Sequence, residues 1–316
     1  MEFDPAQMRN VMTDFWAVVL SPVAMHKFFH AVFSGWVLAG VFVVGVSCWF
    51  LLKNRRREFA LSSIKVGATV GLVGMIMTLW TGDGSAVDVA KVQPMKLAAM
   101  EGLYNGSCGQ PISAIGIVNP AKTAENDEDP YLFDISIPYG LSLLATHNPH
   151  AFVPGINDLI EGIELTPQGD TIRHDSYATR IAMGKRAHES LRAFDAATAA
   201  GNKAAADSAA QALKEDYKYF GYGYLTSPAQ AVPPVALTYY SFRIMVGIGS
   251  LLLLVLILAL WIAVKRPSLL GRKWILWIGM ICVPLVWVCS EAGWVVAEVG
   301  RQPWIIQDIM PVTAAV

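Results

Sequence analysis

Four long apolar runs restrict the possible folds of this chain more than any other feature. A helix needs roughly 20 apolar residues to cross the hydrocarbon core of a bilayer. Runs of about that length occupy residues 28–52, 61–81, 235–264 and 274–297. The whole chain is 54% hydrophobic and 16% charged, which excludes an ordinary soluble domain. We therefore predict an all-α, polytopic transmembrane bundle of four spans, with a large outer-face loop domain that contains helices.

The short loops between these runs predict which way the chain crosses the membrane. Basic residues gather in both of them: Lys53, Arg55, Arg56 and Arg57 in the first, and Lys265, Arg266, Arg272 and Lys273 in the second. Because cytoplasmic loops carry an excess of Lys and Arg, both turns are expected on the cytoplasmic side. The net charge of −1 gives no sign of a nucleic-acid partner.

This orientation divides the chain into five parts. They are an outer-face lead-in (1–27), a first helix pair (28–81), an outer loop (82–234), a second helix pair (235–298) and an outer-face tail (299–316). The loop is too long for a simple connector and should have its own structure. Its first part, 82–165, is rich in Gly, Pro and Asn, and its part 176–217 has a helical pattern that Gly201 and Asn202 interrupt.

His30 and Met245 lie in the outer halves of two different spans. A ring nitrogen that faces hydrocarbon is costly, so His30 should face the bundle interior or a ligand. Imidazole and thioether together are the axial ligands of a low-spin haem iron. A packed, hydrogen-bonded histidine, a gap-filling methionine, and His26 as the ligand in place of His30 remain open alternatives.

Four further charged residues lie within the spans or close to their ends. A guanidinium inside a span needs an anion, and a haem propionate would satisfy Arg243. Glu298 and Arg301 form an interfacial ion pair within a Trp belt, or else Glu298 is an iron ligand or a proton-relay carboxylate with Arg301 as a neighbouring positive charge. Glu291 lies deeper and is a second costly acid that could serve a proton path.

Lys96 and Glu101 border an apolar surface just after the second span. A carboxylate within hydrogen-bond reach of a quinol hydroxyl could accept its proton. The alternative is an interfacial amphipathic helix whose charged ends reach into water. The spacing of Lys96 and Glu101, taken alone, favours the amphipathic helix.

Seven segments of the chain resemble subunit I of the cytochrome bd-type quinol oxidases, in family order and across nearly the whole length. They are Lys27-Phe-Phe-His30-Ala-Val, Gly82-Asp83-Gly-Ser85, Gln93-x-x-Lys96-Leu-Ala-Ala-x-Glu101, Ile137-Pro138-Tyr139-Gly140, Phe242-Arg243-Ile244-Met245-Val246, Glu291-Ala-Gly-Trp294 and Glu298-x-Gly300-Arg301-Gln302-Pro303-Trp304. The last of these is specific by itself.

The resemblance implies site roles that composition could not supply. His30 and Met245 look like the axial ligands of the low-spin haem b, with Arg243 as the partner of a propionate. Lys96 and Glu101, with Asp83 nearby, look like the quinol-oxidation region, called the Q-loop in this family. Glu298 looks like the ligand of the high-spin haem b, with Trp294 and Arg301 beside it.

The resemblance also implies cofactors, partners and a location. The family passes electrons from ubiquinol or menaquinol through the low-spin haem b to the high-spin haem b and haem d, where O2 becomes water. It works with oxidase subunit II, a small accessory subunit and membrane lipid, in the bacterial inner (plasma) membrane with the Q-loop on the periplasmic face. A proton gradient results.

This chain departs from the family pattern at both ends. Subunit I normally has four further spans before the region of Met1 and one after the carboxyl terminus, and the ligand of haem d belongs to an early span. We therefore expect a fragment of subunit I, inactive in O2 reduction by itself. The competing hypotheses are a membrane haem b electron carrier without oxygen chemistry, and a non-catalytic transporter or sensor with an outer ligand-binding loop.

Overall fold

The computed structural model describes residues 2–4, 9–166 and 170–315. The chain divides into two compact units. We call Pro22–Ser85 with Tyr240–Val296 the bundle unit, and Met1–Ser21, Ala86–Tyr239 and Ala297–Val316 together the loop unit.

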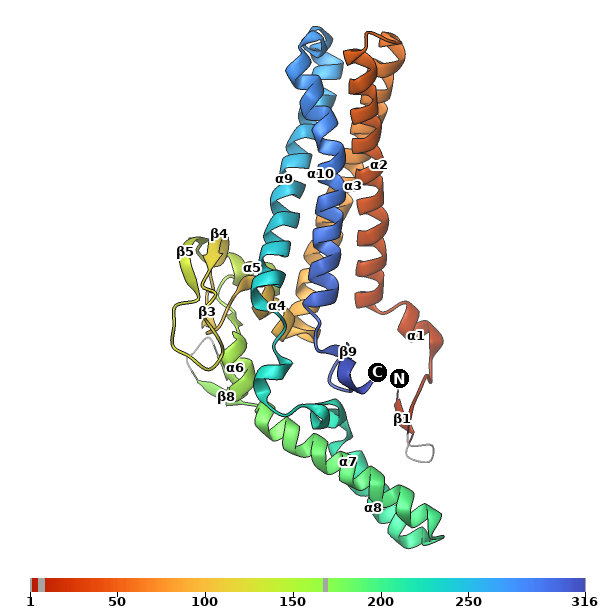
Figure 1. The fold of residues 1–316 in the computed structure, drawn as a ribbon, viewed down its shortest axis with the longest axis vertical. Coiled ribbons are helices and arrows are strands. Elements are labelled where there is room, and N and C mark those ends of the chain that lie inside the picture. The colour runs from red at the N-terminus through yellow and green to blue at the C-terminus, as the bar shows by residue number, and fades with distance from the viewer. Residues whose placement is uncertain (1, 5–8, 167–169, 316) are drawn as a thin grey trace. The chain divides into compact units, whose positions relative to one another are not determined.

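Four long antiparallel helices run side by side in the bundle unit (Figure 1). They are α2 (Pro22–Leu52), α3 (Arg57–Val92), α9 (Val235–Lys265) and α10 (Lys273–Val299), with the short 3-10 helix η3 (Pro267–Gly271) joining the last two. Within the described residues these four helices are long and apolar enough to span a membrane. The predicted fold class, an all-α bundle of four spans, is confirmed.

Glycine allows α2 and α3 to approach each other closely. A Cβ atom added to Gly40 would lie 2.6 Å from the carbonyl oxygen of Gly67 and 2.6 Å from the Cα of Gly71. Helices in lipid gain no hydrophobic driving force from one another, so they depend on such close packing. An alanine at position 40 would force the two backbones apart.

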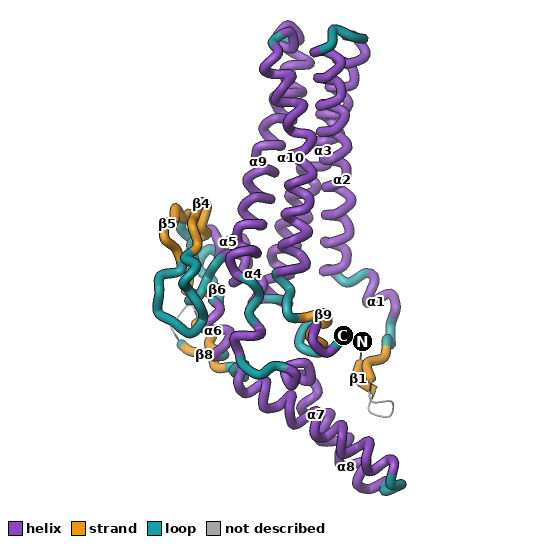
Figure 2. Tube along the Cα trace, viewed as in Figure 1, coloured by secondary structure: helices purple, strands orange, loops and turns teal. Residues whose placement is uncertain are grey.

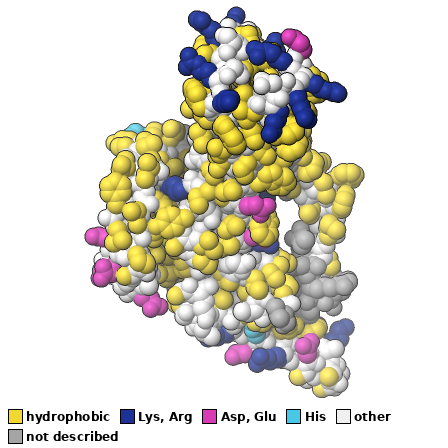
Figure 3. All heavy atoms as spheres, turned by 45° about the horizontal axis from the view of Figure 1, so that its top comes forward, with side chains coloured by type: hydrophobic (Ala, Val, Ile, Leu, Met, Phe, Trp, Pro, Cys, Tyr) yellow, Lys and Arg dark blue, Asp and Glu magenta, His cyan; other side chains and the backbone are white. Residues whose placement is uncertain are grey.

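Large apolar side chains cover the outside of the bundle unit, as expected of a surface that faces lipid. Examples are Trp36, Phe42, Leu254 and Trp277, all of which are exposed. Figure 3 shows Lys and Arg side chains gathered at the end of the bundle where both hairpin turns lie, next to this apolar surface.

Two of the helices extend beyond the predicted limits of their spans. α2 begins at Pro22, where the sequence predicts a start at residue 28. α3 continues to Val92, so Gly82-Asp83-Gly84-Ser85 is helical and does not open the loop. The reason is packing: an added Cβ would lie 3.3 Å from the His30 ring at Gly82 and 2.7 Å from the His26 ring at Gly84. These glycines make room for imidazoles.

The loop unit combines short helices with two-stranded antiparallel sheets (Figure 2). Its helices are α1 (Phe15–Val19), α4 (Pro94–Glu101), α5 (Gly140–Thr146), α6 (Ile156–Glu161), α7 (Tyr177–Ala199), α8 (Lys203–Asp216), and the 3-10 helices η1 (Tyr217–Tyr224), η2 (Pro228–Ala231) and η4 (Val312–Ala314). The strand pairs are β1 (Glu2–Asp4) with β2 (Arg9–Val11), β3 (Ser107–Cys108) with β6 (Phe152–Val153), β4 (Ile112–Val118) with β5 (Tyr131–Ile137), β7 (Ile163–Leu165) with β8 (Thr171–Arg173), and β9 (Trp304–Ile306) with β10 (Met310–Pro311).

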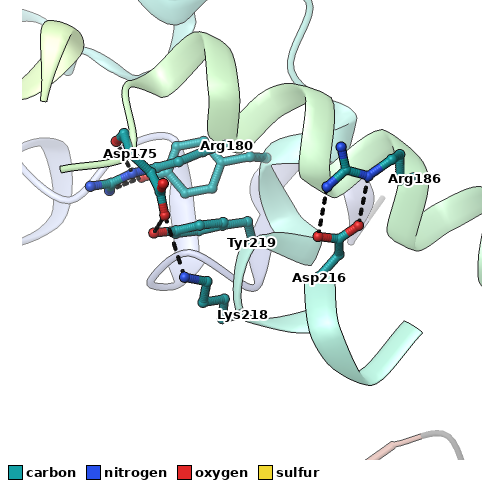
Figure 4. Close-up of polar contacts among 7 residues, drawn as sticks. Asp175, Arg180, Arg186, Asp216, Lys218 and Tyr219 are labelled. Atoms are coloured by element: carbon teal, nitrogen blue, oxygen red, sulfur yellow. Dashed lines mark hydrogen bonds and ion pairs between the residues drawn. The ribbon is translucent and has the colours of Figure 1, made fainter. Parts of the chain in front are cut away.

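A cluster of aromatic and charged residues joins α7 to η1 in the loop unit. The Arg180 guanidinium lies 4.9 Å from the ring centre of Tyr177 and 5.2 Å from that of Tyr219. The hydroxyl of Tyr219 donates a 2.8 Å hydrogen bond to Asp175, which also pairs with Lys218 (Figure 4). Further along α7, Arg186 holds Asp216 through two parallel hydrogen bonds of 2.9 and 3.0 Å.

The Asp175 carboxylate should make stability depend on acid pH. The hydrogen bond from Tyr219, with help from Lys218, holds the pKa of Asp175 below its ordinary value. A lowered folded-state pKa stabilises the fold above the unfolded pKa, and this contribution disappears as pH falls through the folded pKa. We therefore expect Asp175→Asn to lower the melting temperature at pH 7, and to do so less as the pH approaches 3.

The size of this effect should be modest, because the Asp175 side chain is 39% exposed and solvent screens its charge. A loss of at most about 1 kcal/mol at pH 7 is expected. Thermal unfolding of the solubilised protein over a pH series measures it, with Asp207→Asn on the exposed face of α8 as control. A difference between Asp175→Asn and the unmutated chain that stays constant with pH would contradict this interpretation.

Candidate functional site

The His30 imidazole is held in a defined orientation inside the bundle unit. Its Nδ1 lies 3.3 Å from the hydroxyl oxygen of Thr81 on α3. That hydroxyl donates its proton to the carbonyl of Met77, at 2.9 Å, so it accepts a hydrogen bond from Nδ1–H. The tautomer this favours leaves the lone pair of Nε2 available for a metal ion, the arrangement common for metal-binding histidines.

The Met245 thioether lies against Gly293 of α10. A Cβ atom added to Gly293 would lie 2.9 Å from the Met245 sulfur. The Cys289 thiol donates to the Met245 carbonyl oxygen at 3.3 Å, which adds a second contact between the same two helices. Gly293 belongs to the Glu291-Ala-Gly-Trp294 segment. The sequence alone drew attention to Glu291 and Trp294 of this segment and not to the glycine.

Three other predicted site residues belong to the bundle unit. Arg243 is partly buried on α9, with its guanidinium 5.2 Å from the ring centre of Phe242. Asp83 is exposed on α3, next to the glycine that contacts His30. Trp294 is exposed on α10.

Lys96 has a clear structural partner in the loop unit. Its side chain is buried, and its Nζ donates a 3.1 Å hydrogen bond to the carbonyl oxygen of Ala297 in the last turn of α10. The last carbonyls of a helix have no partner within the helix, and a cation there also interacts favourably with the helix dipole. Lys96 therefore caps α10 from α4.

Glu101 is the last residue of α4, and its side chain is only 2% exposed. Gly102 follows in the left-handed conformation, with φ of 61°, and ends the helix. The Tyr131 hydroxyl donates to the Glu101 backbone carbonyl, which fixes the end of α4 to strand β5. The sequence thus places a buried carboxylate at a well-defined helix end.

Glu298 and Arg301 form a close ion pair at the end of α10, with 2.6 Å between Oε2 and the guanidinium nitrogen. A small cavity of about 10 Å³ lies beside them, lined in part by Lys96, Gly300, Arg301, Gln302 and Trp304. The buried Nε of Arg301 has no hydrogen-bond partner among the described residues. This nitrogen fits an additional acceptor, such as an anionic group of a cofactor.

These donors fit haem better than a bare metal ion. Among the residues that the structure describes, no group of three or more His, Cys, Asp and Glu side chains could hold an ion. A haem iron needs only axial ligands from the protein, and an imidazole, a thioether and a carboxylate are all suitable donors. The oriented lone pair of His30 is the most specific of these observations.

The predicted site residues fall into two sets, one in each unit. The bundle unit holds His30, Asp83, Arg243, Met245 and Trp294, and the loop unit holds Lys96, Glu101, Glu298 and Arg301. Within the loop unit, α4 and the end of α10 meet at Lys96, which lies in the third recognised segment and bonds to Ala297, the residue just before the last segment. Sequence reasoning missed Thr81 and Gly293, which are a hydroxyl and a small residue next to a candidate ligand.

A membrane helix bundle with an oriented imidazole on one helix and a thioether on another carries donors that can ligate a haem iron. The chain belongs to the cytochrome bd terminal oxidase subunit I family, whose model matches residues 1–316. Membership of this family implies haem cofactors.

Similar proteins support this family membership. The chain is 37% identical to cytochrome bd-II ubiquinol oxidase subunit 1 of Escherichia coli K12, over 99% of this chain and 59% of that protein. It is 28% identical to cytochrome bd ubiquinol oxidase subunit 1 of Bacillus subtilis 168, over 98% and 52% of the two chains. A chain of the bd oxidase from Geobacillus thermodenitrificans has the same fold, with a TM-score of 0.67 at 22% identity, over 98% of this chain and 54% of that one. The chain thus spans a little over half the length of these relatives.

Proposed function

We propose that this chain supplies the quinol-oxidising region and haem-ligating helices of a cytochrome bd-type terminal oxidase, a quinol:oxygen oxidoreductase. Quinol is oxidised at the outer face of the bacterial inner membrane, and O2 is reduced to water. Subunit II and the parts of subunit I outside this chain complete the enzyme. Support comes from the family match over residues 1–316 and from the names of the relatives, which are ubiquinol oxidases.

The observation that carries the proposal is the orientation of His30 by Thr81, with 3.3 Å between Nδ1 and the hydroxyl oxygen. This hydrogen bond fixes the direction of the ring and leaves Nε2 free for a metal ion. In this proposal His30 and Met245 hold a low-spin haem b, and Arg243 neutralises a propionate. When bound, the haems act as one-electron carriers between quinol, a two-electron donor, and O2.

The loop unit contributes the groups that handle quinol and its protons. Glu101 is the proposed proton acceptor, since a buried carboxylate can take the hydroxyl proton of quinol when the two are within hydrogen-bond reach. Lys96 has a positioning role, because its ammonium group is bonded to the end of α10. Asp83 is proposed to take part in quinol oxidation as well.

Glu298 is proposed to serve the high-spin haem b, with Trp294 and Arg301 beside it. Its ion pair with Arg301 supports this role, because the guanidinium places a positive charge beside the carboxylate that would act as the ligand. The unpartnered Arg301 Nε provides a donor for a further anionic group. Release of quinol protons outside and uptake of protons from the cytoplasm builds a gradient.

A second candidate is a membrane haem b electron carrier without oxygen chemistry. It is favoured by the position of the candidate axial ligands His30 and Met245, which both lie on helices of the bundle unit. The bundle by itself carries donors for a low-spin haem, and such a protein could pass electrons to another partner.

One experiment separates these candidates from a non-catalytic membrane protein. The chain is expressed with the remaining oxidase subunits, and its membranes are tested for a reduced-minus-oxidised haem b band and for quinol-dependent O2 uptake. The oxidase gives both signals. A band without O2 uptake supports the electron carrier, and the lack of a band rejects both haem proteins.

A further inference from the structure

The β4–β5 hairpin presents an unusually apolar face to its surroundings. Ile115 pairs with Ile135 and Ile117 pairs with Phe133 in the register of the two strands, so all four side chains lie on one face. Their exposed fractions range from 51% to 65%. We call these four residues the hairpin stripe. A contiguous apolar surface of this kind marks a site of contact with protein or membrane.

The opposite face of the hairpin is fixed to the start of a membrane-spanning helix. Ser113 Oγ and the hydroxyl of Tyr239, on the second turn of α9, are 2.7 Å apart. Gly116 lies so near that an added Cβ would be 2.5 Å from the same hydroxyl. Tyr239 is completely buried in this contact, while Leu237 on the same turn is exposed. The hairpin is therefore anchored where α9 begins.

We propose that the hairpin stripe lies in the outer lipid leaflet, at the boundary between headgroups and acyl chains. The reason is that the hairpin is anchored at Tyr239, in the first turns of a membrane-spanning helix, where Leu237 is also exposed. The stripe carries no charge, whereas the loop between the two strands holds four acids that stay in water: Glu125, Asp127, Glu128 and Asp129. Lipid thus covers the apolar face, and the acidic loop remains outside.

The hydrogen bonding of a two-stranded hairpin limits how deep it lies. Each strand of this two-stranded sheet has a neighbouring strand along one edge only, and the hydrocarbon core cannot supply hydrogen bonds to the other edge. The hairpin consequently rests at the interface, as amphipathic helices do, with its apolar side chains directed into the acyl region. It neither spans the bilayer nor enters its centre.

Lipid-attached quenchers test this proposal directly. A bimane fluorophore is placed at Ile117→Cys in a Cys108→Ser background, because Cys108 is exposed. The chain is assembled with its oxidase partners in nanodiscs of phosphatidylcholine and phosphatidylglycerol that contain a nitroxide lipid. The matched control is Ile172→Cys on β8, an exposed isoleucine of a different hairpin in the same unit. Phe133→Cys is a second position on the stripe, in case the first variant does not fold.

The proposal expects a several-fold greater loss of fluorescence from the nitroxide lipid at Ile117 and Phe133 than at Ile172. Aqueous iodide should give the reverse order. Equal quenching by iodide at all three positions would show a stripe in water and overturn the proposal. Protection of the stripe from both quenchers would show a protein partner covering it, which overturns the proposal as well.

Discussion

Replacing His30 with alanine or Met245 with leucine is expected to abolish the low-spin haem b band, while the chain remains in the membrane. Each change removes one axial donor and leaves the helix that carries it apolar and intact. The remaining ligand cannot hold the iron in its six-coordinate low-spin state. Reduced-minus-oxidised spectra of membranes, at equal protein content, provide the measurement.

His26→Ala is the matched control, because His26 lies one helical turn earlier on α2 and packs against Gly84 in the way that His30 packs against Gly82. It should keep the band. Loss of the band in His26→Ala but not in His30→Ala would identify His26, one turn earlier, as the ligand. Unchanged spectra in both His30→Ala and Met245→Leu would exclude this pair as the ligands.

Glu101→Gln is expected to slow quinol oxidation by about two orders of magnitude, without loss of haem. Glutamine has nearly the same shape and can remain buried at the end of α4, but it cannot accept a proton from a quinol hydroxyl. The measurement is steady-state O2 uptake with a soluble quinol in the assembled oxidase, next to the haem spectrum of the same sample.

Glu161→Gln serves as the control for this prediction, since Glu161 is an exposed acid at the end of another short helix, α6. It should leave turnover unchanged. Full activity of Glu101→Gln would make this carboxylate a structural residue, and equal losses in both variants would point to a general effect of charge on the loop unit.

Hydropathy predicted the bundle well because the bilayer imposes one strict rule, that every buried backbone group must be bonded within the helix. Runs of about 20 apolar residues can satisfy it only as helices, so four runs gave four spans. The helical segment near α7 and α8 was similarly accessible, since Gly201 and Asn202 interrupt an otherwise regular pattern. Gly201 has a φ of 67° in the turn between them.

The continuation of α3 to Val92 could not be read from local sequence. Gly82-Asp83-Gly84-Ser85 has the composition of a loop, and glycine disfavours an isolated helix. Its role depends on His26 and His30 of α2, whose rings occupy the space that larger side chains would fill. A tertiary contact thus outweighs the local preference.

The contact between Lys96 and Ala297 is also a tertiary contact that local sequence could not predict, because these residues are 201 positions apart. Their spacing gave no hint that a lysine after the second span would cap the fourth. The strand pairs of the loop unit were missed because most are two or three residues long, too short to show an alternating pattern. β4 and β5 are longer, but their outward face is as apolar as a buried face. Their sequences therefore do not show the usual pattern of an apolar inner face and a polar outer face.

The segment after α10 is fastened to η1 by Asp308. The Tyr222 hydroxyl donates to the Asp308 carboxylate at 2.9 Å, and the Gly221 amide donates to the Asp308 carbonyl at 3.1 Å. The Trp304 ring also packs on Tyr222, with 4.8 Å between ring centres. Residues that follow α10 are therefore an integral part of the loop unit, and local opening of either segment must expose the other.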